Sequence, residues 1–202
     1  MEEWPSPAEP WRACLELSWE AYLAGSVPVG AVVVDPAGEI VARGRNRAFE
    51  AHLAGSLAGT RLAHAEVDAL AQLPTTGRYS GHVLYSALEP CLLCLGAALL
   101  STVGTIRYAG ADPAGGACRV SIPVEDLMRR ELAIDEPLGG WPGRLSQSLS
   151  VAFWLGLGEP RYAWIAEAHG AETNAAARRI MSLTERPDRF EDALPALLDC
   201  LP

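Results

Sequence analysis

The chain reads His-Ala-Glu at residues 64–66 and Pro-Cys-Leu-Leu-Cys at residues 90–94. Each stretch opens an expected helix, over 64–73 before Pro74 and over 91–100 after Pro90. Cys91 and Cys94 stand three residues apart, so their sulfur atoms can point toward one spot. A helix N-terminus and a bound cation both lower a thiol pKa, and thiolates are therefore expected there.

One imidazole and two thiolates are a known ligand set for zinc, and three protein ligands leave the fourth tetrahedral position to water. We therefore expect His64, Cys91 and Cys94 to hold one zinc ion, which would lower the pKa of a bound water to roughly 7. Glu66 is two residues from His64 and reaches the same pocket without being a ligand. We expect it to accept a proton from that water and to deliver it to a leaving nitrogen.

The pattern around these motifs predicts alternating helices and strands. Before the first motif, apolar spacing predicts a helix over 11–23. Short β-branched or apolar runs bounded by turn residues predict four strands, over 29–34, 39–43, 82–87 and 104–109. This order favours an α/β fold in which a sheet lies between two layers of helices.

The sequence changes character after Cys118. We expect residues 119–202 to form a helical extension packed on a core of residues 8–118, the whole chain 1–202 being a single domain. The expected elements are a short helix over 123–134, a Pro/Gly-rich connection over 135–147, a helix over 161–183 with Gly170 as a candidate break, and a last helix over 190–201. We expect the aromatic residues of this extension to belong to the core or to a subunit interface rather than to a base-stacking surface. They are Trp141, Phe153, Trp154, Tyr162 and Trp164.

Taken together, the motifs resemble the zinc signature of the cytidine deaminase superfamily. The likeness extends over about residues 8–118, to the runs that begin at Val27 (VPVGAVVV), Gly44 (GRNR), Leu88 (LEPCLLCLGA) and Tyr108 (YAGAD). These are similar to the branch of tRNA adenosine deaminases and guanine deaminases. The resemblance implies a cytidine deaminase-like three-layer α-β-α fold with a mixed sheet of about five strands, commonly in a homodimer. A fifth strand would then lie in or near the extension.

The resemblance also implies roles for particular residues. His64, Cys91 and Cys94 would hold zinc, and Glu66 would move the proton. Asn46 matches an asparagine that hydrogen-bonds the substrate, and two residues, Pro28 and Val29, match backbone positions that line the pocket.

The chain departs from the family pattern beside the pocket. Residues 60–63 read Thr-Arg-Leu-Ala where this branch usually carries Asp-Pro-Thr-Ala, and the segment from Asn46 to His64 is longer than in the tRNA enzymes. Cys118 has no expected role. The identity of the substrate is therefore open.

The composition bears on whether the partner is a nucleic acid or a small molecule. The 202 residues carry a net charge of −9, and all 16 basic residues are arginine. An acidic chain gains little from phosphate electrostatics, which argues against a nucleic-acid partner without excluding one. The odd count of five cysteines is poor evidence for disulfides, and the acidic N-terminus is unlike a signal peptide. We expect a cytoplasmic protein with no membrane segment.

Three functions remain. The first is hydrolytic deamination of a small nucleobase, nucleoside or related heterocycle, cytosine- or guanine-like, with release of ammonia. The second is deamination of a tRNA wobble adenosine, and the third is a catalytically idle, zinc-stabilised binding subunit. Two smaller alternatives are a redox Cys-x-x-C pair and a structural zinc site with a fourth ligand drawn from Cys118, His52 or His82.

Overall fold

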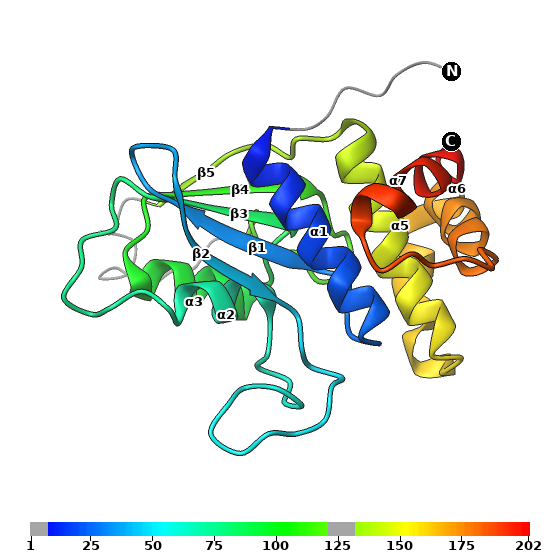
Figure 1. Ribbon diagram of the computed structural model, residues 1–202, viewed down its shortest axis with the longest axis horizontal. Coiled ribbons are helices and arrows are strands. Elements are labelled where there is room, and N and C mark those ends of the chain that lie inside the picture. The colour runs from blue at the N-terminus through cyan, green and yellow to red at the C-terminus, as the bar shows by residue number, and fades with distance from the viewer. Residues whose placement is uncertain (1–7, 121–131) are drawn as a thin grey trace.

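Five strands form one mixed sheet in the computed structural model, which describes residues 8–120 and 132–202 (Figure 1). The order across the sheet is β2-β1-β3-β4-β5. β1 is antiparallel to β2 and β3, whereas β3–β4 and β4–β5 are parallel pairs. The strands are β1 (Gly30–Val34), β2 (Ile40–Arg45), β3 (Val83–Leu88), β4 (Thr105–Gly110) and β5 (Ala133–Ile134).

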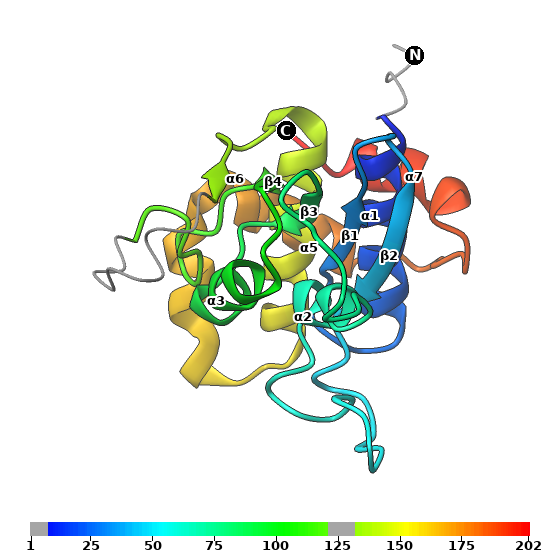
Figure 2. The ribbon, with the colours of Figure 1, turned by 90° about the vertical axis from the view of Figure 1, so that its left-hand side faces the viewer.

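Helices cover both faces of this sheet (Figures 1 and 2). α2 (Ala65–Leu70) and α3 (Leu92–Ser101) lie on one face, and α1 (Glu9–Leu23) and α5 (Gly140–Gly156) lie on the other. α6 (Ala163–Met181) and α7 (Phe190–Asp199) pack on α5, away from the sheet. The three-layer α-β-α fold and its C-terminal helices are thus confirmed.

β1 is an interior strand that lies between β2 and β3, and all five of its residues are buried. Ala31 and Val33 pack with the helices α2 and α3, while Val32 and Val34 pack with α1. Successive side chains of a strand point to opposite faces, so a run of valines serves both layers at once. This two-sided burial agrees with the predicted sheet between two layers of helices.

α1 joins the core to the C-terminal helices. Leu15 and Trp19 of α1 belong to the same apolar cluster as residues of α5, α6 and α7. The indole Nε1 of Trp19 also donates a hydrogen bond of 2.8 Å to the carbonyl of Pro187. The extension consequently shares an apolar core with the first helix of the chain.

Most elements lie where the sequence predicts them, including the helix break at Gly170, which has φ 80° and ψ 175°. The fifth strand lies in the extension, as expected. Ala133–Ile134 is this strand rather than a helix end, so the helix predicted over 123–134 is wrong there, while residues 121–131 lie outside the described residues. The connection predicted over 135–147 is wrong from Gly140, where α5 begins, because Pro142 falls in the first helical turn and needs no N–H partner there.

None of the helices within the described ranges combines the length and apolar character that crossing a membrane requires.

Candidate active site

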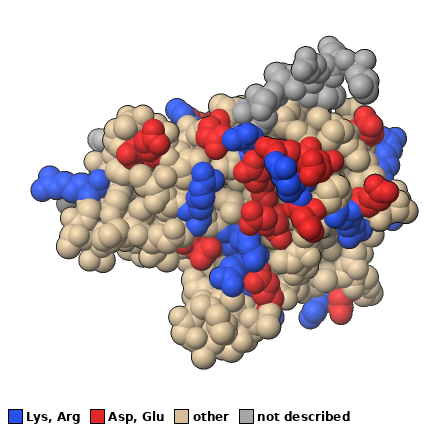
Figure 3. Space-filling model, in the orientation of Figure 1, with Lys and Arg blue, Asp and Glu red and all other residues tan. Residues whose placement is uncertain are grey.

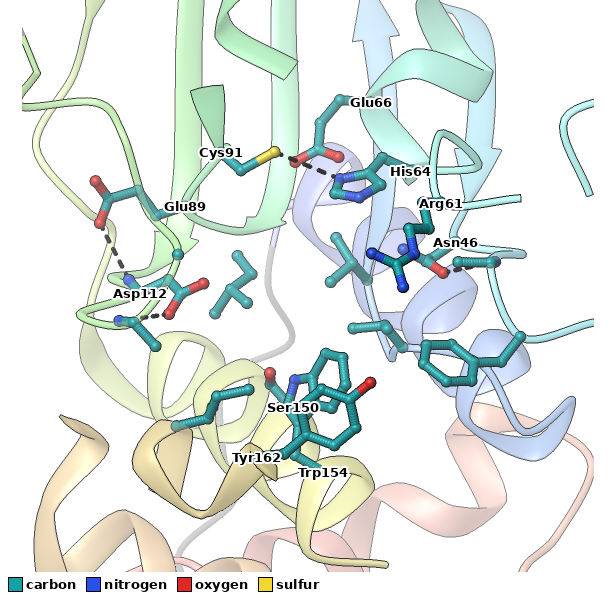
Figure 4. Close-up of a pocket in the computed structure, with 18 of the residues that line it drawn as sticks. Asn46, Arg61, His64, Glu66, Glu89, Cys91, Asp112, Ser150, Trp154 and Tyr162 are labelled. Carbon is teal, nitrogen blue, oxygen red and sulfur yellow. Dashed lines mark hydrogen bonds between the residues drawn. The ribbon is translucent and has the colours of Figure 1, made fainter. Parts of the chain in front are cut away.

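The starts of α2 and α3 bring three metal-ligating side chains together, two of which, His64 and Cys91, are seen in Figure 4. His64 is the N-cap of α2, and Cys91 is the N-cap of α3. Nδ1 of His64 lies 3.5 Å from Sγ of Cys91 and 3.4 Å from Sγ of Cys94, and the two sulfur atoms are 3.6 Å apart. In the described part of the chain, only these three form a group of ligand atoms close enough to hold a metal ion. This group does not include the candidate fourth ligands, Cys118, His52 and His82.

The donor set fits zinc. Its ligand atoms all lie within 4.8 Å of one another, as three corners of a tetrahedral site require. Hydrogen bonds from Cys94 and His64 lower the pKa of the Cys91 thiol to about 4, which favours its thiolate form, whereas the hydrogen bond to Cys91 and burial raise the pKa of Cys94. A hydrogen bond to Cys91 raises the pKa of His64. The three side chains form a zinc site.

Glu66 is buried beside this site, with 3% of its surface exposed. Its Oε1 accepts a hydrogen bond of 3.0 Å from the Ser86 hydroxyl, and its Oε2 accepts one of 3.2 Å from the Cys94 thiol. Burial raises the pKa of this carboxyl, because a charge is poorly solvated there. A carboxyl group that can take up a proton therefore lies directly next to the metal ligands.

Asn46 lies on the same cavity, just after the end of β2, and is 3% exposed. Its Oδ1 accepts hydrogen bonds of 2.9 Å from the Ser26 hydroxyl and from the N–H of Ala48. In the described ranges nothing accepts a hydrogen bond from its Nδ2. The amide is therefore held by its oxygen, and its N–H groups are left for a ligand.

The cavity has a volume of about 650 Å³ and includes Val29 in its wall. Pro28 is not part of this wall: its side chain is fully buried, and its neighbour Val27 lines the cavity instead. Arg61, from the segment 60–63 that departs from the family pattern, also lines the cavity (Figure 4). Val27 opens one of the runs that carry the resemblance, but the sequence assigns a role neither to Val27 nor to Arg61.

The far wall of the cavity comes from the C-terminal extension. Figure 4 shows Trp154 and Tyr162 across the cavity from His64, Glu66 and Cys91. Trp141 and Phe153 are buried, which confirms them as core aromatics, whereas Trp154, Tyr162 and Trp164 line the cavity. The extension contributes Ser150, Trp154, Arg161, Tyr162, Trp164 and Ile165. Motif spacing misses all six, and only the density of aromatic residues hints at them.

A loop after β4 closes another side of the cavity. Glu89, which directly follows β3, and Asp112, which lies in this loop, both line the cavity. The Glu89 carboxylate accepts hydrogen bonds from the N–H of Asp112 at 3.0 Å and from the N–H of Cys118 at 3.1 Å. Oδ1 of Asp112 lies 3.3 Å from Nε2 of His169 in α6. Cys118 therefore belongs to the supporting loop, and the carboxylate of Asp112 ties this loop to the extension.

Comparison with known proteins agrees with this geometry. The family model of the cytidine and deoxycytidylate deaminase zinc-binding region matches residues 8–109. The tRNA-specific adenosine deaminase of Haemophilus influenzae is 32% identical over 145 residues, which cover 70% of this chain and 80% of that protein. A solved structure of a tRNA:A34 deaminase is 26% identical with a TM-score of 0.50, over 62% of this chain and 96% of that one.

Other similarities are partial or concern the fold alone. A guanine deaminase structure from Nitrosomonas europaea has a TM-score of 0.50 at 21% identity, over 82% of this chain and 86% of that one. The tRNA(Ile)-lysidine synthases of Deinococcus radiodurans and Deinococcus deserti are 42% identical over 118 and 106 residues, 55% and 51% of this chain. The chain spans only 19% of the length of each of these two relatives.

The matched region contains the whole metal triad, Glu66 and Asn46, and it ends one residue before the end of β4. The chain belongs to the zinc-dependent cytidine and deoxycytidylate deaminase family.

Proposed function

We propose that this protein is a hydrolytic deaminase of a small nucleobase, nucleoside or related heterocycle, cytosine- or guanine-like. One observation carries the proposal: a single cavity of about 650 Å³ joins the metal triad and Glu66 to a wall made by the chain's own C-terminal extension. Pockets of this size and partly aromatic lining suit a small ligand. The extension lies beyond the region that the family model matches.

Metal binding, proton transfer and substrate binding fall to different residues of the site. His64, Cys91 and Cys94 would hold zinc, and the bound ion would supply Lewis-acid activation of the attacking water. Glu66 takes a proton from that water and passes it to the exocyclic nitrogen. The ring carbon exchanges its amine for a carbonyl oxygen, so water is consumed and ammonia leaves. Nδ2 of Asn46 and the guanidinium of Arg61 offer hydrogen-bond donors to ring nitrogens or carbonyl oxygens.

The second candidate is deamination of a tRNA wobble adenosine, which the named activity of the Haemophilus influenzae relative favours. The charge distribution weighs against it. Figure 3 shows acidic side chains gathered on one face with arginines among them. In α1, Arg12 pairs with Glu9, Glu16 and Glu191. The described residues on that face form no unbroken basic stripe of the kind that follows a phosphate backbone.

An ammonia-release screen separates these candidates. The zinc-loaded protein is offered cytosine, guanine, adenine, their nucleosides and a tRNA anticodon stem-loop. We expect release from at least one free base or nucleoside and none from the stem-loop. Release from the stem-loop alone would establish the tRNA activity instead, and no release from any compound would favour the idle binding subunit.

We propose further that the chain forms a homodimer and acts in the cytoplasm. On the outside of α3, Leu92 and Leu93 are 58% and 38% exposed, which supports a contact between copies. Light scattering on the purified protein tests the dimer. All five cysteines are free thiols, as in proteins of a reducing compartment.

A further inference from the structure

We infer that Trp154 and Tyr162 form a stacking platform on which the heterocyclic ring of the substrate lies during deamination. This inference rests on the proposed function and names the surface that recognises the ring. Both residues come from the extension, Trp154 from α5 and Tyr162 from the short helix η1 (Pro160–Tyr162). Both line the cavity that contains the metal triad.

The two rings contact each other at an angle and together form one aromatic wall of the cavity. Their centroids are 4.7 Å apart, with an angle of 48° between the ring planes. Figure 4 shows them side by side at the end of the cavity opposite Cys91, His64 and Glu66. A planar ligand that occupies the space between the metal side and these two rings therefore has an aromatic surface within contact distance.

Other side chains contact the two rings and fix their positions. Phe153 contacts Trp154 edge to face at 5.1 Å, and Phe49 contacts it at 5.8 Å. The guanidinium of Arg161 lies 4.8 Å from the centre of the Tyr162 ring. Phe49 belongs to the long loop after Asn46, so the core and the extension both fix the position of Trp154. Aromatic rings held in this way lose little further freedom when a ligand binds.

The burial of these residues separates them from ordinary core aromatics. Trp141 and Phe153 are 7% and 6% exposed, whereas Trp154 and Tyr162 are half-buried and retain surface toward the cavity. An aromatic ring with one packed side and one side on a cavity suits stacking, which every nucleobase accepts. The platform therefore selects planar heterocycles as a class, while Asn46 and Arg61 offer the polar contacts that distinguish one ring from another.

The chain contains matched controls outside the cavity. Trp11 is a half-buried tryptophan whose ring contacts Tyr85 edge to face at 4.9 Å. Tyr22 resembles Tyr162 closely, since it is half-buried, stacks with Trp19 at 5.5 Å and has Arg186 5.3 Å from its ring centre. Neither lines the cavity, so replacing them removes a similar ring without touching the proposed platform.

The test measures binding in the full-length, zinc-loaded Glu66→Gln protein, so that turnover does not interfere. Calorimetry gives Kd for cytosine, guanine, adenine and their nucleosides. Trp154→Leu and Tyr162→Leu are each expected to raise the Kd of the ring that binds by about tenfold. Trp154→Phe and Tyr162→Phe are expected to restore most of that loss, whereas Trp11→Leu and Tyr22→Leu leave Kd unchanged.

A second measurement covers the case in which a leucine variant does not fold. Stacking on an indole quenches its fluorescence, so ligand quenching is expected in the Glu66→Gln protein and is expected to be largely lost with Trp154→Phe. An unchanged Kd in the leucine variants, unchanged quenching with Trp154→Phe, or no binding of any of the six compounds overturns the platform. Ammonia release by the wild type with an unchanged Kd in the variants overturns the platform alone. Platform-dependent binding without ammonia release overturns only the proposed function.

Discussion

The metal site is made by three side chains that lie at the first residues of two helices. Metal binding and folding are coupled, because a preformed site does not exist in the unfolded chain. We therefore expect Cys91→Ser and Cys94→Ser to lose zinc and to unfold at lower temperature. Elemental analysis of the purified variants and thermal unfolding measure the two effects.

Cys118 provides the control for these variants. It is half-buried near the same site, but it is not one of the grouped ligands. Cys118→Ser is expected to keep one zinc ion per chain and a melting temperature close to that of the wild type. If Cys118→Ser loses zinc while Cys94→Ser keeps it, the ligand assignment is wrong.

Asp112 makes a pH-dependent contribution to stability. Burial disfavours its charge, but the imidazole of His169 and the N–H groups of Gly115 and Ala114 outweigh burial and hold its pKa below the usual value. Such a group stabilises the fold above its unfolded pKa, and this stability is lost as the pH falls through its folded pKa. Asp112→Asn should therefore lower the free energy of unfolding at pH 7 by about 1 kcal/mol. The difference should shrink below about pH 4.

Urea unfolding at pH 7 and pH 3 checks this expectation. The exposed Asp135, which accepts a hydrogen bond of 2.6 Å from Arg107, is the control, since a surface ion pair contributes under about 1 kcal/mol. An Asp112→Asn effect of equal size at both pH values would show that its charge is not the cause.

The close packing of α5 on the sheet depends on a glycine, Gly143. A Cβ at Gly143 would lie 2.6 Å from the carbonyl oxygen of Ala109 in β4, and that backbone atom cannot move aside cheaply. Gly143→Ala is expected to lower the free energy of unfolding by about 1–3 kcal/mol, because α5 must shift from β4. Urea unfolding measures the change.

The control lies at the end of the same helix. A Cβ at Gly156 would have nothing within 4 Å. Gly156→Ala should be neutral or stabilise by up to about 1 kcal/mol, since alanine favours a helix over glycine. Equal destabilisation by the two substitutions would contradict the close packing of α5 on β4.

The sequence predicts an element well when local signals form it, and poorly when contacts between distant parts of the chain form it. The β-branched run of β1 and the prolines before or after α2 and α3 act locally, so the sequence predicts these elements. α5 is different, since its start reads Gly-Gly-Trp-Pro-Gly and looks like a loop. What makes it a helix is packing on β4 and on α6, which local sequence does not contain.

The candidate site divides in the same way. The metal triad, Glu66 and Asn46 belong to short motifs with fixed chemistry, and the structure places all of them on one cavity or against it. Trp154 and Tyr162 reach that cavity only through the packing of the extension, some 60 residues beyond Cys94 in the case of Trp154. From the sequence alone, these two residues cannot be distinguished from core aromatic residues such as Phe153.

The core and the extension are expected to unfold as one unit. Leu15 and Trp19 in the first helix pack with Leu145, Leu149 and the later helices, so neither part has an apolar core of its own on that side. Circular dichroism reports mainly the helices, while zinc release reports the metal site in the core. The two are expected to give coincident urea transitions. Two separated transitions would show that residues 119–202 form an independent domain.

The central claim concerns the whole enzyme: Glu66 moves the proton in a zinc-dependent deamination. The most direct measurement determines zinc content and ammonia release on the same samples of wild type and Glu66→Gln, with the best substrate of the screen. We predict that both proteins carry one zinc ion per chain, and that the variant releases ammonia about 10²–10⁴ times more slowly. Full activity in a zinc-loaded Glu66→Gln protein would contradict the account.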